Sequence, residues 1–301
     1  MRKITIVFCV TALVISVAYA QSNRVTVSED SAYRYITSNG IPEHRTGQFP
    51  NRGNPNAITE QQYQFRVPLH PKVASHPIPL DMAAFGVARN GIPLDPGAAE
   101  FWKNDWNSGW QYEAMSGRIP LGIDQNNAHV QPNGAYHYHA MPSFAEPSPP
   151  AGQRVKQMYL FGYAADGFPI YALYAYSDPK DMRSALKPMR SSYQLKEGLR
   201  PSGPGGYYDG TFVADYEYVK DSGDLDECNG RFGVTPDYPQ GIYHYVLTKG
   251  FPFIPRYFRG TPDASFRKRG PGPGDHGGQG GPHSIPRNRP EDRLPPPPPR
   301  R

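Results

Sequence analysis

The stretch "NGAYHYHA", residues 133–140, alternates two tyrosines and two histidines behind an Asn-Gly pair. Successive side chains of a β-strand point to opposite faces, so His137 and His139 share one face with their Cα atoms about 6–7 Å apart. Tyr136 and Tyr138 then share the other face. Asn-Gly in front of such a run is a strong hairpin signal. The stretch therefore predicts a strand that presents two imidazoles from a rigid backbone.

The composition of the whole chain also favours β structure. Its 301 residues include 35 prolines and 31 glycines, which interrupt long helices. Short apolar or aromatic runs alternate with Gly, Pro, Asn and Asp, and an Asp-Gly pair at 166–167 between two such runs predicts another hairpin. We expect a mainly β fold, formed by a single compact β-rich domain with few short helices.

The two ends of the chain differ in composition from its centre. Residues 1–20 combine a positively charged start, an apolar run and an Ala-Tyr-Ala ending, which predicts a secretory signal peptide. Residues 21–62 are polar and turn-rich, and 63–262 form the expected β-rich domain. Residues 263–301 are a basic Pro/Gly-rich tail that is predicted to be disordered. Signal cleavage would leave a secreted or periplasmic protein without a membrane span.

The formal net charge of +5 belongs to the tail. Residues 267–301 contain eight Lys or Arg and three Asp or Glu, whereas the rest of the chain is neutral. A neutral remainder gives no basic face of the kind that binds nucleic acid. The tail itself is a candidate contact for envelope polymers.

Three sequence blocks recur in the same order in the two halves of the domain, about 63–150 and 151–262. The paired blocks are "FGVARNGIPL" (85–94) with "FGYAADGFPI" (161–170), "IDQNNAH" (123–129) with "LDECNGR" (225–231), and "NGAYHYH" (133–139) with "QGIYHYV" (240–246). The pattern favours an internal duplication, and chance similarity of Gly- and Tyr-rich segments is the alternative. Halves packed about a pseudo-two-fold axis would bring His137 opposite His244.

A His-x-His pair on a strand offers two ligands to a metal ion, and a tight site needs a third. His129 is the first candidate, because a hairpin turn at 132–134 would bring it beside His137. Further candidates for completing the coordination sphere are His244 and His44, followed by Cys228, Asp226 and Asp124. Imidazole ligands suit a transition metal ion, Cu or Zn, and the sequence does not choose between them.

Several function classes remain open. The histidines either bind a transition metal, or only form structural hydrogen bonds, or act in acid–base chemistry without a metal. A metal-assisted hydrolase of the envelope would also need a base such as Asp124 or Asp226. A non-metal structural or glycan-binding envelope module is a further alternative, with an aromatic platform formed by Trp102, Trp106 and Trp110. Cys228 is the one cysteine outside the predicted signal peptide, so no internal disulfide is expected.

The sequence resembles the YHYH-domain family, exported proteins of poorly defined function, over about residues 38–262. The blocks that carry the resemblance are "SNGIPEHRTGQFPNRGNPN" (38–56), "GVARNGIPLDPG" (86–97), "NGAYHYHAMP" (133–142), "DGFPIYA" (166–172), "LDECNGR" (225–231) and "GIYHYVLTKGFPFIPRYFRG" (241–260). The resemblance implies that residues 21–62 pack on the domain as an extended segment, which strengthens His44 as a candidate. It also implies a cysteine where this chain has Asn126, so a thiolate role there is excluded.

Overall fold

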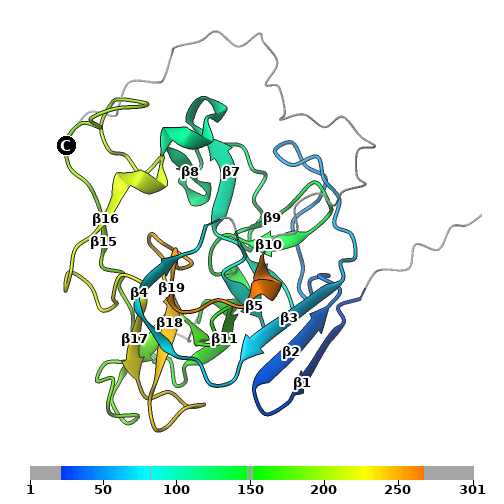
Figure 1. The fold of residues 1–301 in the computed structure, drawn as a ribbon, viewed down its shortest axis with the longest axis vertical. Helices are drawn as coiled ribbons and strands as arrows, with labels where there is room; N and C mark the ends of the chain where they lie inside the picture. The colour runs from blue at the N-terminus through cyan, green and yellow to red at the C-terminus, as the bar shows by residue number, and fades with distance from the viewer. Residues whose placement is uncertain (1–21, 82, 148, 150–151, 268–301) are drawn as a thin grey trace, which may run out of the picture. The chain divides into compact units, whose positions relative to one another are not determined.

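The computed structural model describes residues 22–267, apart from 82, 148 and 150–151 (Figure 1). The described part is mainly β and contains no helix of seven or more residues, which confirms the predicted fold class. It belongs to one compact unit that ends at Arg267. The predicted signal peptide and residues 268–301 of the predicted tail lie outside the described residues.

An eight-stranded sheet forms the centre of this unit, in the order β9-β10-β6-β5-β11-β12-β18-β17. The first half of the domain contributes β5 (Gly86–Ala88), β6 (Pro93–Leu94), β9 (Ala128–Val130) and β10 (Tyr136–Tyr138). The second half contributes β11 (Tyr159–Ala164), β12 (Pro169–Ala172), β17 (Gly230–Gly233) and β18 (Ile242–Leu247). Both predicted hairpins are present, β9–β10 around Gly134 and β11–β12 around Gly167, each glycine having a positive φ.

The pattern of parallel and antiparallel pairing in this sheet is the same when it is followed inward from either edge. Each half has an outer antiparallel pair, then a parallel pair, then an inner antiparallel pair, and β5 joins β11 in the middle. A duplication would produce such an order, and common origin of the halves stays a prediction. The expectation that His137 faces His244 is wrong, because the halves join edge to edge and four strands separate β10 from β18.

Hydrogen bonds around one aspartate in each half also correspond. Asp124 accepts bonds from the backbone N–H groups two and four residues later, at 2.8 and 3.3 Å. Asp226 accepts the same two bonds at 3.0 and 3.1 Å. The hydroxyl of Tyr136 donates to Asp124 at 2.8 Å, and that of Tyr243 donates to Asp226 at 2.9 Å. Both aspartates therefore hold the turn that leads into the edge strand of the sheet.

The N-terminal segment forms its own sheet and then follows the first half of the domain. Its strands are β1 (Val25–Glu29) and β2 (Tyr33–Ser38), which pair with β3 (Tyr63–Pro68). Between β2 and β3 the chain is irregular, with a turn closed by the Asn51–Asn54 bridge, and it is bonded to the central sheet. Gly47 N donates to Asp124 at 2.9 Å and Asn54 Nδ2 donates to the Val130 carbonyl at 2.9 Å. These bonds place His44 next to β10.

The folded part extends beyond the predicted end of the domain at residue 262. A short 3-10 helix, η6 (Ala264–Phe266), follows the strand pair β4 (Val73–Pro79) and β19 (Tyr257–Gly260). The Phe266 ring is buried and stacks on Phe65 with centroids 4.7 Å apart. Residues 263–267 are thus part of the domain, because one aromatic side chain anchors a segment whose composition resembles the tail.

Each half carries an insertion outside the central sheet. The first contains β7 (Gly97–Phe101), η1 (Trp102–Asn104), η2 (Trp106–Ser108), β8 (Gln111–Glu113) and η3 (Ala114–Ser116), and η4 (Ser143–Ala145) follows β10. The second contains β13 (Tyr174–Tyr176), β14 (Leu186–Pro188), β15 (Tyr193–Leu195), η5 (Val213–Asp215) and β16 (Tyr216–Tyr218). The tryptophans do not line one helical face, because left-handed residues Lys103 and Asn104 interrupt the segment. Trp110 is buried and packs edge-on against Phe212.

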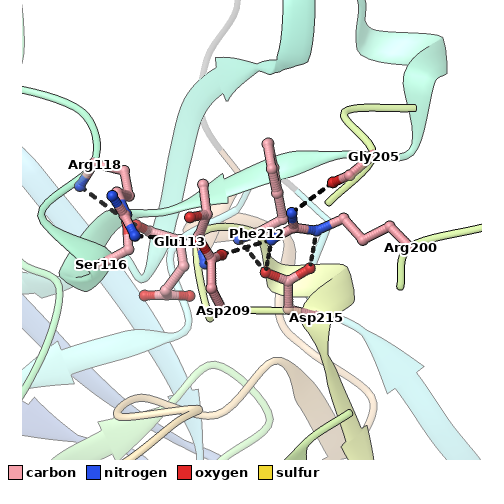
Figure 2. A network of polar contacts seen from close by, with 9 residues as sticks. Glu113, Ser116, Arg118, Arg200, Gly205, Asp209, Phe212 and Asp215 are labelled. Carbon is pink, nitrogen blue, oxygen red and sulfur yellow. Dashed lines mark hydrogen bonds and ion pairs between the residues drawn. The ribbon is translucent and has the colours of Figure 1, made fainter. Parts of the chain in front are cut away.

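A network of charged groups connects the two insertions (Figure 2). Arg200 donates two hydrogen bonds to Asp215, at 2.8 and 2.6 Å, and a third to Asp209 at 2.6 Å. Asp209 also accepts a bond from Arg118 of the first insertion at 3.2 Å. The Arg200 and Asp215 side chains are almost fully buried, so neither charge tolerates loss of its partner. The network therefore fixes the insertions that flank the central sheet.

Candidate metal centre

Three histidine rings converge on one face of the β9–β10 hairpin. The antiparallel register places His129 directly opposite His137, and His139 follows two residues later on the same face. The three pairs of ring centroids lie 4.6, 4.7 and 4.7 Å apart. One ring nitrogen from each histidine can be chosen so that all three lie within 4.8 Å of one another. The structure thus brings together the three histidines that the sequence pattern favoured most as metal ligands.

Backbone carbonyls orient two of these rings. His129 Nδ1 lies 2.9 Å from the Leu121 carbonyl, and His137 Nδ1 lies 3.2 Å from the Ala135 carbonyl. A carbonyl only accepts, so Nδ1 of each ring carries the proton and Nε2 keeps its lone pair. Metal-binding histidines are generally held in this way by a partner of the second nitrogen.

His139 completes the cluster with a different arrangement of hydrogen bonds. Its Nε2 lies 3.0 Å from Nε2 of His137. Because the His137 Nδ1 is committed to a carbonyl, His139 donates the shared proton through Nε2. Its own Nδ1 is buried and forms no hydrogen bond with the described residues. The Pro96 carbonyl lies near enough to favour a protonated ring, although outside the geometry of a formed hydrogen bond.

The environment keeps His139 neutral. Burial is the main cause that lowers its pKa well below the usual range, and repulsion from His137 and His129 adds to it. His137 and His139 are 3% and 1% exposed, whereas His129 is only partly buried. Neutral imidazole is the form that binds metal ions. The cluster therefore places a neutral His139 in a buried setting beside His137, with His129 as its more accessible member.

A buried ion pair stands beside the cluster. Arg256 donates to Glu113 at 2.6 Å and to the Pro96 carbonyl at 2.9 Å. Burial raises the pKa of Glu113, and Arg256 opposes this rise. Arg256 also contributes to the lowered pKa of His139. No sequence signal pointed to Arg256, Glu113 or Pro96, because no motif marks a backbone carbonyl or an arginine from a distant segment as part of a histidine site.

The structure places His44 on the other face of β10. Its Nε2 is 2.7 Å from the hydroxyl of Tyr138, which points away from the histidine cluster. Its Nδ1 lies 3.1 Å from the side-chain amide of Asn126, which also donates to the Arg45 carbonyl. His44 is therefore not brought to the cluster. Asn126, which stands where the resemblance implied a cysteine, is one of the residues that hold His44 in place.

The remaining candidates lie apart from the cluster as well. His244 is fully buried in β18, opposite Arg231. Asp124 and Asp226 hold the two equivalent turns described above. Cys228 is buried, and burial raises the pKa of its thiol, so it is a poor nucleophile and a poor metal ligand at neutral pH. These residues support the fold around the strands on which the histidines stand.

The fold and the site define a mainly β protein with a candidate three-histidine metal centre on one hairpin. The family model described as YHYH protein matches residues 64–260, and the chain belongs to this family. The predicted resemblance is thereby confirmed. A search of curated proteins and a search of solved structures each found no match. Within residues 22–267 we find no helix with the length and apolar character that crossing a bilayer requires.

Proposed function

We propose that this protein binds one transition metal ion, zinc or copper, through His129, His137 and His139. The observation that carries the proposal is the convergence of three imidazoles from adjacent strands, two of them with Nδ1 already bonded to carbonyls. Tetrahedral zinc–nitrogen bonds of about 2.0–2.1 Å place two ligand nitrogens roughly 3.3 Å apart. The 3.0 Å between His137 and His139 is close to this separation, so a small outward shift suffices.

A bound ion would replace the proton that His137 and His139 share. His139 Nε2 would then be a ligand, and its proton would move to Nδ1. The His139 ring is neutral before and after this exchange, so the tautomer change releases no net proton. His139 Nδ1, which forms no hydrogen bond with the described residues, would become a donor.

Three protein ligands leave one coordination position of a tetrahedral ion for a further group. Such a group would approach past His129, because His129 is the least buried of the three histidines. The bases foreseen for a hydrolase do not serve this position. Asp124 and Asp226 each accept bonds from backbone N–H groups and a tyrosine hydroxyl in their own turns. Metal binding is therefore the function that the geometry supports, and a hydrolytic role has no base among the residues predicted for it.

Elemental analysis and calorimetry of the purified chain test the proposal. We expect one equivalent of zinc or copper per chain, and a rise in melting temperature with added metal because the ion binds the folded state. His137→Ala should abolish both effects. The matched control is His76→Ala, which removes an exposed histidine on β4. A native chain that neither retains nor takes up metal would contradict the proposal.

Export is a separate proposal that rests on the predicted signal peptide. N-terminal sequencing of the protein from a culture medium or periplasmic extract should begin at Gln21, directly after the Ala-Tyr-Ala ending. An intact N-terminus in the cytoplasmic fraction would contradict it.

A further inference from the structure

A cavity of about 290 Å³ lies on the tyrosine side of the YHYH strand and has no role in the proposed metal centre. Its lining combines three aromatic rings with one acidic, one basic and one amide side chain: Phe144, Tyr159, Phe161, Glu43, Arg89 and Asn90. These residues come from the N-terminal segment, the turn after β5, η4 and β11. A cavity of this size suits a small ligand rather than a polymer.

Three aromatic rings line the cavity. Phe161 is buried, whereas Phe144 and Tyr159 are 43% and 40% exposed. The centroids of Phe144 and Tyr159 lie 6.5 and 6.4 Å from that of Phe161, so the three rings border one space. Aromatic faces attract cations, most effectively cations such as alkylated ammonium groups that lose little hydration on binding.

The charged side chains at the rim have opposite signs. Glu43 and Arg89 are both exposed, and neither forms an ion pair or a side-chain hydrogen bond within the described part of the chain. Glu43 lies near enough to Tyr138 to contribute to the raised pKa of its hydroxyl, after burial as the main cause. The rim thus offers an anion for an ammonium group and a guanidinium for a carboxylate.

The floor of the cavity is held in place by hydrogen bonds. Asn90 is buried and donates through Nδ2 to the Tyr138 hydroxyl at 2.9 Å, and this hydroxyl lies 2.7 Å from His44 Nε2. The His44 ring in turn packs on Phe144 with centroids 4.6 Å apart. One wall and the floor are therefore fixed before a ligand arrives, which reduces the entropic cost of binding.

We propose that this cavity binds a small zwitterion that carries an alkylated ammonium group and a carboxylate on one short frame. The ammonium group contacts the three rings and Glu43, and the carboxylate pairs with Arg89. This assignment uses every charged and aromatic group of the lining. It also gives His44 a role that the metal centre does not, since its ring supports the Phe144 wall.

Calorimetry and ligand-observed NMR with trimethylglycine, choline and acetate test the assignment on the purified full chain. Trimethylglycine should bind with a Kd of about 1 mM or lower, choline more weakly and acetate not measurably. Phe144→Ala and Glu43→Gln should each weaken trimethylglycine binding about tenfold. Arg89→Gln should remove the preference for trimethylglycine over choline while leaving choline binding unchanged.

Two controls separate this proposal from the metal centre and from unfolding. Phe232→Ala removes an exposed ring on β17 and should leave zwitterion binding unchanged. His137→Ala should also leave it unchanged, because His137 faces the other side of the strand. The melting temperature of each variant is measured as well, and binding is compared among variants whose melting temperature equals that of the native chain. Two results would overturn the proposal. One is that the native chain shows no saturable trimethylglycine binding, and the other is that the Phe144, Glu43 and Arg89 variants bind it as tightly as the native chain does.

Discussion

The two outer hairpins of the central sheet, β9–β10 and β17–β18, share one backbone arrangement but differ in chemistry. His137 and His244 occupy equivalent positions, and each Nδ1 lies 3.2 Å from the carbonyl two residues earlier. The neighbours differ, because Arg231 stands where the first hairpin has His129, and Val246 stands where it has His139. The same strand pairing therefore yields three converging imidazoles in one half and a single imidazole beside a guanidinium in the other.

The lone imidazole of the second hairpin shows what the cluster gains from its neighbours. His244 Nε2 is buried and has no hydrogen-bond partner among the described residues. The pKa of His244 is lowered to about 4, mainly by burial and to a smaller extent by the charge of Arg231. Arg231 points its guanidinium to the Tyr176 carbonyl. A cation beside the only imidazole disfavours a metal ion there, so two substitutions decide whether this frame forms a candidate site.

The largest expected difference between the hairpins is in metal affinity. His137→Ala should weaken binding by more than about 100-fold, since even an outer-shell partner contributes roughly 10–100-fold. His244→Ala, the equivalent change in β18, should leave metal affinity unchanged. Competition titration with a zinc chelator measures both. Equal losses in the two variants would mean that the hairpins do not differ as described.

Rebuilding the cluster in the second hairpin is the converse experiment. The double variant Arg231→His, Val246→His would place three imidazoles around the equivalent of His137. We expect the metal stoichiometry to rise from one to two ions per chain. The second site should be weaker than the first, because the variant does not introduce counterparts of Pro96 and Arg256 beside the new imidazoles. Elemental analysis after dialysis reports the count. A count that stays at one in a folded variant would show that the shared frame is insufficient.

The unpartnered histidine should make the second hairpin sensitive to acid. The His244 pKa is about 4 in the folded state and about 6.5 when unfolded, so the unfolded chain binds more protons between these values. Its contribution to stability is present above pH 6.5 and falls as the pH drops to 4, by about 3 kcal/mol. Urea unfolding of the native chain and of His244→Phe should diverge over this range.

Comparing the two curves removes an opposing effect from another buried group in the same half of the domain. Burial raises the pKa of Asp166 to about 6, so its contribution to stability is present at low pH and lost as the pH rises toward 6. Asp166 is unchanged in both chains, so only His244 accounts for a difference. Parallel curves from pH 7 to pH 4 would contradict the assignment.

A smaller effect is expected from the ion pair that only the first hairpin has nearby. Arg256→Met removes the donor to the Pro96 carbonyl and leaves Glu113 unpaired. The charge of Arg256 is paired with Glu113, so it does not oppose a metal ion as the charge of Arg231 does in the second hairpin. Without its bond to Arg256 the Pro96 carbonyl near His139 is less firmly held, and metal affinity should fall by roughly 10-fold. Arg259→Met is the control, an arginine of β19 close in sequence. A loss of stability without a change in the metal Kd would limit Arg256 to a structural role.

Local patterns in the sequence predicted the parts of the fold that depend on near neighbours. Alternation with a period of two and the Asn-Gly and Asp-Gly pairs predicted both hairpins. The same alternation predicted that His137 and His139 share a face, and the hairpin added His129. These predictions succeeded because strand geometry and turn residues act over fewer than about ten residues.

The relation between the halves did not follow from the sequence. The recurrent blocks were recognisable, but the central β5–β11 pair, which sets the halves edge to edge, is a long-range contact without a local signal. It separates His137 from His244 and leaves Asp124 and Asp226 as turn residues. The burial of Phe266 likewise depends on Phe65, two hundred residues away in the chain.

The sequence by itself determined the strands, their turns and the three histidines of one hairpin face, since each follows from backbone geometry and adjacent side chains. Tertiary structure alone decided which candidates stay outside the cluster, which carbonyls orient its rings, and that His44 supports a cavity on the opposite face. The reason is that these relations depend on pairing between distant segments, whose free energy comes from the burial of the whole sheet and not from any one stretch.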